Sequence, residues 1–286
     1  MERLRISTSI SLHNESREDP VEYFAKGLYF LRDIGFDAGD MPSFFFRAAG
    51  DAPEKAVERI HAAAEDSGVQ VELCHLPFGM DDLKTDEEKA LFSKRMYKAM
   101  DVAKMLGVKY SVVHPFAPLV PISEYDEKKQ RELVMKDLAP VAEYANKIGL
   151  TIVLENMRYA YAKEGVRRYC CTAEQICSVV DEFGMGICWD FGHAHVKGQL
   201  QSEWLSYMGK RIKMLHVHDN YPTVDAHVAP FLGKIDWQDA MQGLKKIGYQ
   251  GLLNYEVDTH HVPPVAREDY ARMLVKIAHT LLDMME

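Results

Sequence analysis

Short apolar runs alternate with longer amphipathic segments along the whole chain of 286 residues. The short runs are too brief for helices and are often rich in β-branched residues, which indicates strands. The expected strands span residues 4–10, 35–40, 69–75, 109–114, 150–155, 186–190, 212–216 and 251–256. The expected helices span residues 21–34, 53–67, 87–106, 127–148, 173–183, 201–209, 237–247 and 267–285. Because each helix follows a strand, the alternation predicts βα units joined by right-handed crossovers.

Glycines end several of the expected helices. Glycine is the preferred residue for the left-handed cap at the end of a helix, and the sequence has one shortly before a strand at Gly35, Gly68, Gly107, Gly149, Gly184 and Gly248. Eight regular units favour closure into a (β/α)8 TIM barrel, an α/β fold of about 250 residues. An open doubly wound sheet is the structural alternative. No linker or repeat divides the chain, so we expect one domain over residues 1–286.

Six consecutive expected strands run from apolar residues to a side chain that can bind a metal. These side chains are His75, His114, Glu155, Asp190, His216 and Glu256. The carboxyl ends of the strands of a barrel meet at one mouth, so we expect these six side chains to converge there. Burying them unpaired would be costly, and a shared cation would offset that cost. The pattern therefore predicts a divalent metal site at the mouth.

Two local patterns enlarge this set to nine candidates. The segment Asp190-Phe-Gly-His193 adds an imidazole just past a strand end, and Asp225-Ala-His227 places two like-facing ligands on the loop after the seventh strand. Imidazoles mixed with carboxylates suit zinc, manganese or cobalt, whereas a mostly carboxylate subset would accept magnesium. The additional metal candidates beyond the strand-end carboxylates and His216 are thus His75, His114, His193, Asp225 and His227.

Composition excludes several classes of protein. The net charge of −9 opposes binding of nucleic acid, and no apolar run approaches the ~20 residues of a membrane helix. The N-terminal segment lacks the sections of a signal peptide, so we expect a cytoplasmic protein. Five cysteines, two of them adjacent at Cys170 and Cys171, suit no disulfide framework and predict reduced thiols. The sequence leaves the oligomeric state open, a homo-oligomer included.

Several segments resemble those of the xylose-isomerase-like barrel superfamily. They are LENM, CWDFGH, LHVHDN, DAHVAPFLGKIDW and LLNYEV, and the resemblance covers essentially the whole chain. The superfamily includes sugar isomerases, ketose 3-epimerases, hydroxypyruvate isomerases, inosose dehydratases and the endonuclease IV group. The shared motifs imply the fold and the metal, and they leave the substrate undefined.

The epimerase-like members imply one metal held by Glu155, Asp190, His216 and Glu256. Glu155 and Glu256 would be the catalytic pair that flanks the substrate and moves a proton beside a metal-bound carbonyl. Three histidines would bind the substrate: His75, His114 and His193. This resemblance implies a metal-dependent isomerase or epimerase that acts on a small sugar, sugar acid, polyol or sugar phosphate.

The endonuclease IV group resembles the chain at all nine candidate positions, a set that can hold three zinc ions and hydrolyse a phosphodiester in abasic DNA. The flanking residues differ, because Asn156-Met157-Arg158-Tyr159 replaces the glycine-rich stretch of that group. An inosose dehydratase-like lyase and a non-catalytic binding barrel are further alternatives. Loss of water would identify a lyase, cutting at an abasic site a nuclease, and affinity without turnover a binding barrel.

Overall fold

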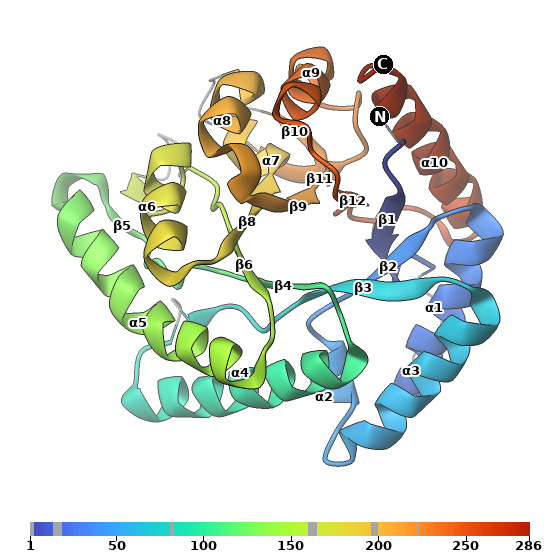
Figure 1. Cartoon of the computed structure of the whole chain (residues 1–286), viewed down its shortest axis with the longest axis horizontal. Helices are drawn as coiled ribbons and strands as arrows, with labels where there is room; N and C mark the ends of the chain where they lie inside the picture. The colour runs from blue at the N-terminus through green and yellow to red at the C-terminus, as the bar shows by residue number, and fades with distance from the viewer. Residues whose placement is uncertain (1–2, 14–18, 81–82, 160–164, 196–199, 222–223) are drawn as a thin grey trace.

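The computed structural model describes residues 3–13, 19–80, 83–159, 165–195, 200–221 and 224–286. Eight parallel strands form its central sheet, with helices outside them (Figure 1). The strands are β1 (Ile6–Ser9), β2 (Ala38–Met41), β3 (Gln70–His75), β4 (Tyr110–Val113), β6 (Ile152–Glu155), β8 (Gly186–Asp190), β9 (Ile212–His216) and β12 (Leu253–Tyr255). They pair in the order β12-β1-β2-β3-β4-β6-β8-β9.

Hydrogen bonds just past β9 join the two ends of this sheet. The backbone N–H of Val217 donates to the carbonyl of Asn254 at 2.8 Å, and the N–H of Glu256 donates to the carbonyl of Val217 at 3.2 Å. The strands therefore form a (β/α)8 TIM barrel, as predicted. The doubly wound alternative is wrong, because an open sheet would leave β9 and β12 at opposite edges.

An outer ring of helices surrounds the barrel. The helices are α1 (Pro20–Ile34), α3 (Pro53–Ser67), α4 (Asp86–Leu106), α5 (Glu127–Ile148), α6 (Ala173–Phe183), α8 (Gln201–Met208), α9 (Trp237–Ile247) and α10 (Arg267–Asp283). The predicted bounds agree with these to within a few residues. Each of the predicted capping glycines has a positive φ, which confirms the left-handed caps.

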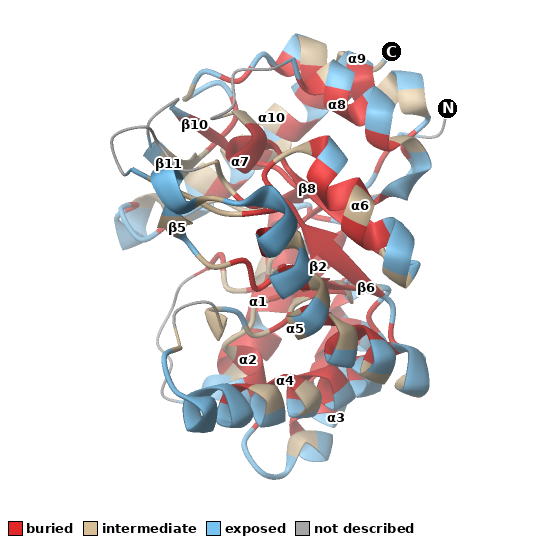
Figure 2. Cartoon of the chain, turned by 90° about the vertical axis from the view of Figure 1, so that its left-hand side faces the viewer, coloured by how far each residue is buried: buried red, intermediate tan, exposed pale blue. Residues whose placement is uncertain are grey.

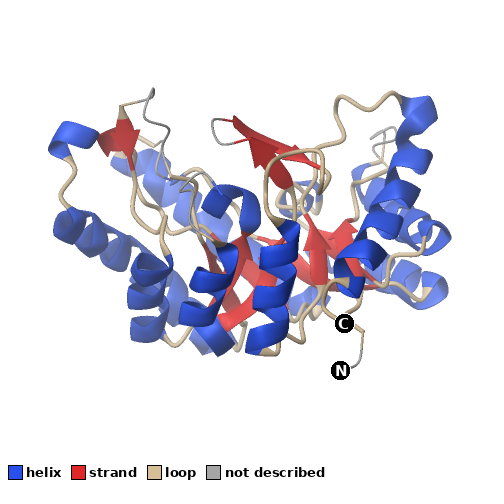
Figure 3. Ribbon diagram, turned by 90° about the horizontal axis from the view of Figure 1, so that it is seen from above, coloured by secondary structure: helices blue, strands red, loops and turns tan. Residues whose placement is uncertain are grey.

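Several short elements lie on the connections after the barrel strands. They are α2 (Phe45–Ala48), the pair β5 (Val120–Pro121) and β7 (Val166–Arg167), α7 (Phe191–His195), and the hairpin of β10 (Asp219–Tyr221) with β11 (Val224–Val228). Three single-turn 3-10 helices complete the described elements: η2 (Ile122–Glu124), η4 (Gly209–Arg211) and η5 (Pro264–Ala266). Figure 3 shows the β10–β11 hairpin above the barrel and both termini at the opposite end. The sequence did not predict these small strands.

The apolar core has two parts, and buried residues concentrate where the helices face the strands (Figure 2). A smaller cluster combines side chains from six of the barrel strands with Leu252, which directly precedes β12. Its members are Ala38, Leu73, Val112, Val153, Cys188, Met214 and Leu252. All five cysteines are buried, and none is paired in a disulfide. No helix within the described residues is both long enough and apolar enough to cross a membrane.

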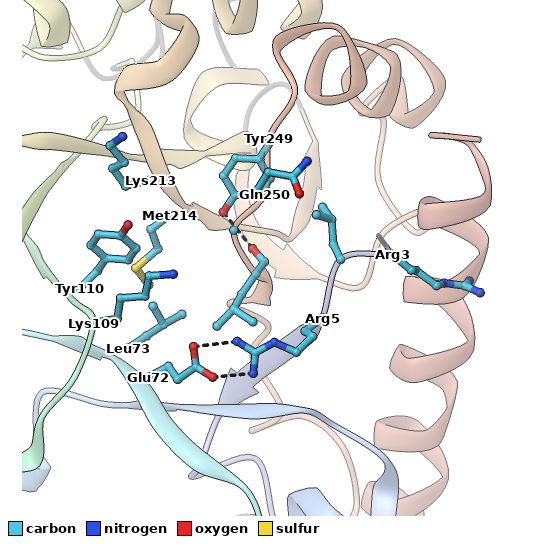
Figure 4. A pocket seen from close by; sticks show the side chains of 13 residues that line it. Arg3, Arg5, Glu72, Leu73, Lys109, Tyr110, Lys213, Met214, Tyr249 and Gln250 are labelled. Carbon is cyan, nitrogen blue, oxygen red and sulfur yellow. Dashed lines mark hydrogen bonds and ion pairs between the residues drawn. The ribbon is translucent and has the colours of Figure 1, made fainter. Parts of the chain in front are cut away.

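A small cavity of about 140 Å³ lies at the amino ends of the strands (Figure 4). There the guanidinium of Arg5 donates to both carboxylate oxygens of Glu72, at 2.6 and 2.8 Å. The Tyr249 hydroxyl donates to the carbonyl of Leu252 at 3.1 Å. The Arg5–Glu72 ion pair links the start of β1 to β3. This end of the barrel is remote from the predicted ligands, which lie at or beyond the carboxyl ends of the strands.

Candidate metal centre

A cavity of about 420 Å³ opens at the carboxyl ends of the strands, and Glu155 and Glu256 both line it. The nine predicted residues converge around this mouth in three groups whose candidate ligand atoms lie within 4.8 Å of one another. One group comprises Glu155, Asp190, His216 and Glu256, another His75, His114 and Glu155, and a third His193, Asp225 and His227. The strand-end pattern and the two local patterns together therefore predicted which side chains lie close to one another.

The first group surrounds the imidazole of His216, the last residue of β9. Its Nδ1 atom lies 3.2 Å from Oε1 of Glu155, 3.3 Å from Oε2 of Glu256 and 3.8 Å from Oδ2 of Asp190. Burial would lower the pKa of His216, but the charges around it, including those of Glu256 and Glu155, raise the pKa well above its usual value. The cluster thus attracts positive charge to this position.

Glu155, at the end of β6, has an imidazole on each side of its carboxylate. Its Oε2 atom lies 3.3 Å from Nε2 of His75 and 3.2 Å from Nε2 of His114. Its Oε1 atom lies 3.4 Å from Nδ1 of His193. Burial would raise the pKa of Glu155, but the charge of His216 and the other imidazoles lowers it well below its usual value. Glu155 therefore stays ionised although its side chain is only 1% exposed.

In the third group, Asp225 and His227 belong to β11 of the hairpin that lies over the mouth. Asp225 Oδ2 lies 3.4 Å from Nε2 of His193, and its Oδ1 lies 3.5 Å from Nε2 of His227. The Nδ1 atom of His227 is 2.9 Å from the carbonyl of Glu256. Burial would lower the pKa of His227, but contact with Asp225 and the nearby Glu256 charge raise it to about 9. Burial would raise the pKa of Asp225, but its two imidazole partners lower it.

Two buried side chains hold Asp190 at the end of β8. The backbone N–H of Asp190 donates to Oδ1 of Asn156 at 2.6 Å, and the Asn156 amide donates back to the Asp190 carbonyl at 3.0 Å. The carboxylate accepts from the backbone N–H of His193 at 2.6 Å and lies 3.0 Å from Nε2 of His218. These contacts fix the direction in which the carboxylate points.

The donor set fits a divalent cation. Nδ1 of His216 and Oε2 of Glu256 are buried, and neither forms a hydrogen bond of ordinary geometry with any residue that the structure describes. Buried polar atoms in proteins are rarely left this way. A cation coordinated by these atoms would satisfy both, and carboxylates with imidazole are suitable ligands for zinc, manganese or cobalt.

Three mouth residues were absent from the predicted site. Asp40 belongs to β2 and lines the mouth cavity. It accepts a hydrogen bond from the Asn254 amide at 2.8 Å, and burial raises its pKa. The expected strand over residues 35–40 ended on this carboxylate, a signal that could have identified it. His218 forms a group with His227 and Glu256. Phe78 lies against His75 and His114, with ring centroids 5.1 Å away in both cases, and no sequence pattern marked it.

An aromatic run of Phe44, Phe45 and Phe46 lies on the connection between β2 and α3. Two of these residues belong to the short helix α2, and Phe45 and Phe46 are buried. Phe44 and Phe45 pack against Phe24 of α1, with ring centroids 5.1 Å apart in both cases. The aromatic run is therefore packed against α1.

The chain was compared with known proteins by sequence and by structure. It is 28% identical over 167 residues to an inosose isomerase of Bacillus velezensis, a match that covers 55% of this chain and 56% of that protein. It is 23% identical over 245 residues to a fructoselysine 3-epimerase of Escherichia coli O157:H7, covering 80% of this chain and 84% of the relative. The chain spans between 41% and 65% of the length of the first curated relatives that it matches.

Solved structures share the whole architecture. A D-allulose 3-epimerase from Methylomonas sp. in complex with D-allulose superimposes with a TM-score of 0.75 at 15% identity, covering 98% of both chains. Identity this low supports the fold alone. The family model described as a xylose isomerase-like TIM barrel matches residues 28–277. Because this match covers most of the chain, the protein belongs to the xylose isomerase-like TIM barrel family.

Proposed function

We propose that the protein is a metal-dependent isomerase or epimerase of a small polyhydroxylated carbonyl compound. The observation that carries the proposal is that Glu155 and Glu256 both reach Nδ1 of His216, at 3.2 and 3.3 Å, from strands separated by β8 and β9. Two carboxylates thus border one cavity from different sides of the mouth. This arrangement suits removal of a carbon-bound proton on one face and its return on the other.

The residues that would hold the cation are Glu155, Asp190, His216 and Glu256. When bound, a divalent cation polarises a carbonyl oxygen, which lowers the cost of removing a proton from the neighbouring carbon. Side chains of the protein would bind and orient the substrate. His75, His114 and His193 present ring nitrogens around Glu155, where they can bind substrate hydroxyls or hold that carboxylate in place.

The two glutamates have different surroundings. Glu155 is enclosed by imidazoles and is 1% exposed, whereas the Glu256 side chain is 35% exposed. Burial would raise the pKa of Glu256, but the charge of His216 lowers it below its usual value, so both carboxylates are ionised at neutral pH. Either can accept a proton, and the more open Glu256 has freer access to a substrate in the cavity.

The names of the relatives support this chemistry. An inosose isomerase and a fructoselysine 3-epimerase are both enzymes that rearrange a sugar-like compound, and the superimposed epimerase binds D-allulose. A proton beside a carbonyl would be moved in each of these cases. The finer choice between isomerisation and epimerisation, and the identity of the metal, are part of the proposal.

The decisive experiment uses protein loaded with Mn²⁺, Co²⁺ or Zn²⁺ and a panel of small ketoses, sugar acids, inososes and sugar phosphates in deuterated water. Deuterium should enter the carbon beside the carbonyl, as seen by NMR, and Glu256→Gln should abolish net turnover. Glu124→Gln, at an exposed position outside the site, is the matched control. Conversion without solvent deuterium would favour a hydride shift, and loss of water would indicate a lyase; either result withdraws the two-glutamate mechanism.

A further inference from the structure

The mouth cavity adjoins a second cavity of about 480 Å³ beside α2 and α4, and Ser43 and Phe78 line both. The second cavity begins where the loops after β2 and β3 leave the barrel. Sites for small molecules in proteins usually measure about 300–1,000 Å³. The mouth cavity is within this range by itself, so it can hold a compact sugar. The second cavity can then hold another part of the same molecule.

Phe78 is one of the two residues that line both cavities. Its ring stacks on that of His114 at an interplanar angle of 28°, while 55% of the residue remains exposed. An aromatic face that is exposed beside a polar site is suited to cover the carbon skeleton of a ligand. A substrate that crosses Phe78 would place its two ends in the two cavities.

The second cavity has an excess of positively charged side chains. It is lined by Arg47, Arg95 and Lys98 and by one carboxylate, that of Asp51, whereas the mouth combines the carboxylates of Asp40, Glu155 and Glu256 with several imidazoles. Lys98 forms an ion pair with Asp51 at 3.0 Å. Within the part of the chain that the structure describes, neither Arg47 nor Arg95 has an ion-pair partner.

Two guanidinium groups without a carboxylate are notable in a protein with a net charge of −9. They come from separate elements, Arg47 from α2 and Arg95 from α4, yet line the same cavity. Guanidinium groups bind the oxygens of phosphate and carboxylate through paired hydrogen bonds. The cavity therefore has the chemistry of an anion site next to the mouth.

We infer that the substrate bears an anionic group, a phosphate or a carboxylate, which Arg47 and Arg95 bind while the carbonyl end lies among the mouth residues. The inference rests on the proposed function, because that function assigns the carbonyl end to the mouth. It makes sugar phosphates and sugar acids the substrate class and leaves neutral sugars as weak ligands. Arg47 and Arg95 are then specificity-determining residues.

The test measures binding of three probes to the Mn²⁺-loaded protein by calorimetry: D-fructose, D-fructose 6-phosphate and D-fructuronate. At least one anionic probe should bind ten times more tightly than D-fructose, and the stronger of the two identifies the group. The double variant Arg47→Gln/Arg95→Gln should lose at least tenfold affinity for that probe and less than twofold for D-fructose. Lys94→Gln, at an exposed position on α4 that does not line the cavity, is the matched control.

The inference is overturned if neither anionic probe binds more tightly than D-fructose, or if the double variant weakens all three probes equally. Both arginines are exposed, so their replacement should leave the melting temperature unchanged. A different result would contradict the proposed function without contradicting this inference. If the arginine-dependent preference is present but no probe or other panel compound exchanges deuterium, the anion site stands and the proton-transfer chemistry is wrong.

Discussion

The imidazole rings of His218 and His227 are stacked, with centroids 3.8 Å apart and planes 9° from parallel. His218 is fully buried, and its Nε2 atom lies within 3.1 Å of both carboxylate oxygens of Asp190. His227 is in turn 3.5 Å from Asp225. The stacked pair thus connects the residues around Asp190 to those around Asp225. A substitution of His218 should therefore alter the geometry at both carboxylates.

We expect His218→Phe to weaken metal binding although the side chain need not touch the metal. Phenylalanine keeps the stacking on His227 but removes the hydrogen bond to Asp190, and loss of such an outer partner typically costs about 10–100-fold in metal affinity. Competition with a chromogenic chelator measures the dissociation constant. His61→Phe, on α3 away from the mouth, is the control. An unchanged dissociation constant in His218→Phe would show that Asp190 needs no support from this histidine.

Gly192 should be intolerant of any side chain. A Cβ atom at Gly192 would lie 2.0 Å from Cε1 of His218, far closer than two carbon atoms can approach. Overpacking of this kind in a buried site typically costs about 1–3 kcal/mol. We expect Gly192→Ala to lower the free energy of unfolding and, by displacing His218, the metal affinity.

A second substitution can relieve this clash. In Gly192→Ala/His218→Ala the ring that the new methyl group meets is absent, so the stability losses of the two single variants should not add. Urea denaturation of all four proteins measures the coupling. Strict additivity would mean that the backbone at residue 192 moves away from His218 and that the close approach has no energetic role.

The sequence predicted the barrel and the six candidate ligands at strand ends because both depend on local periodicity and on where each strand ends. Asp40 illustrates the limit of this reasoning. Its expected strand ended on it, yet its buried partner Asn254 lies 214 residues later in the chain. His218 could be placed near the site from its spacing, but its stacking on His227 depends on a hairpin that the alternation of strands and helices does not encode.

The arginine-lined cavity shows the same limit more strongly. Arg47 and Arg95 are separated by the whole of α3 and β3, and nothing in their local patterns distinguishes them from solvated surface cations. Only the packing of α2 beside α4 brings them to one cavity with Phe78. Properties of loops and of contacts between helices could therefore not be predicted from the order of the elements.

We expect weak or absent cutting of DNA at abasic sites. The nine convergent residues are a sufficient set of ligands for phosphodiester hydrolysis. Tight DNA binding, however, requires several phosphate contacts, and the chain carries a charge of −9. Incubating the zinc-loaded protein with an abasic duplex at physiological salt measures incision. Robust cutting that Glu155→Gln abolishes would favour the nuclease over the sugar enzyme.

The stabilisation that a metal provides should increase with pH. In the metal-free protein the pKa values of His193, His216 and His227 are raised, that of His227 to about 9. A histidine whose pKa is higher in the folded than in the unfolded protein stabilises the fold when it is protonated. This stabilisation is complete below the unfolded-state pKa of about 6.5, and it is lost as the pH rises through the folded-state pKa. The lowered pKa values of Glu155 and Asp225 contribute stability that is lost in acid instead.

The stabilising contributions of these five groups are all present between about pH 5 and 6.5, where Glu155 and Asp225 are ionised and the three histidines are protonated. A metal competes with those same protons, so its affinity increases as they leave. The rise in melting temperature on adding a saturating divalent metal should therefore be larger at pH 8.5 than at pH 6. Differential scanning calorimetry at both values tests this, with Glu155→Gln/Asp190→Asn as the variant that should gain little at either. A larger gain at pH 6 would mean that the metal binds without displacing histidine protons, and that the imidazoles of the mouth are not its ligands.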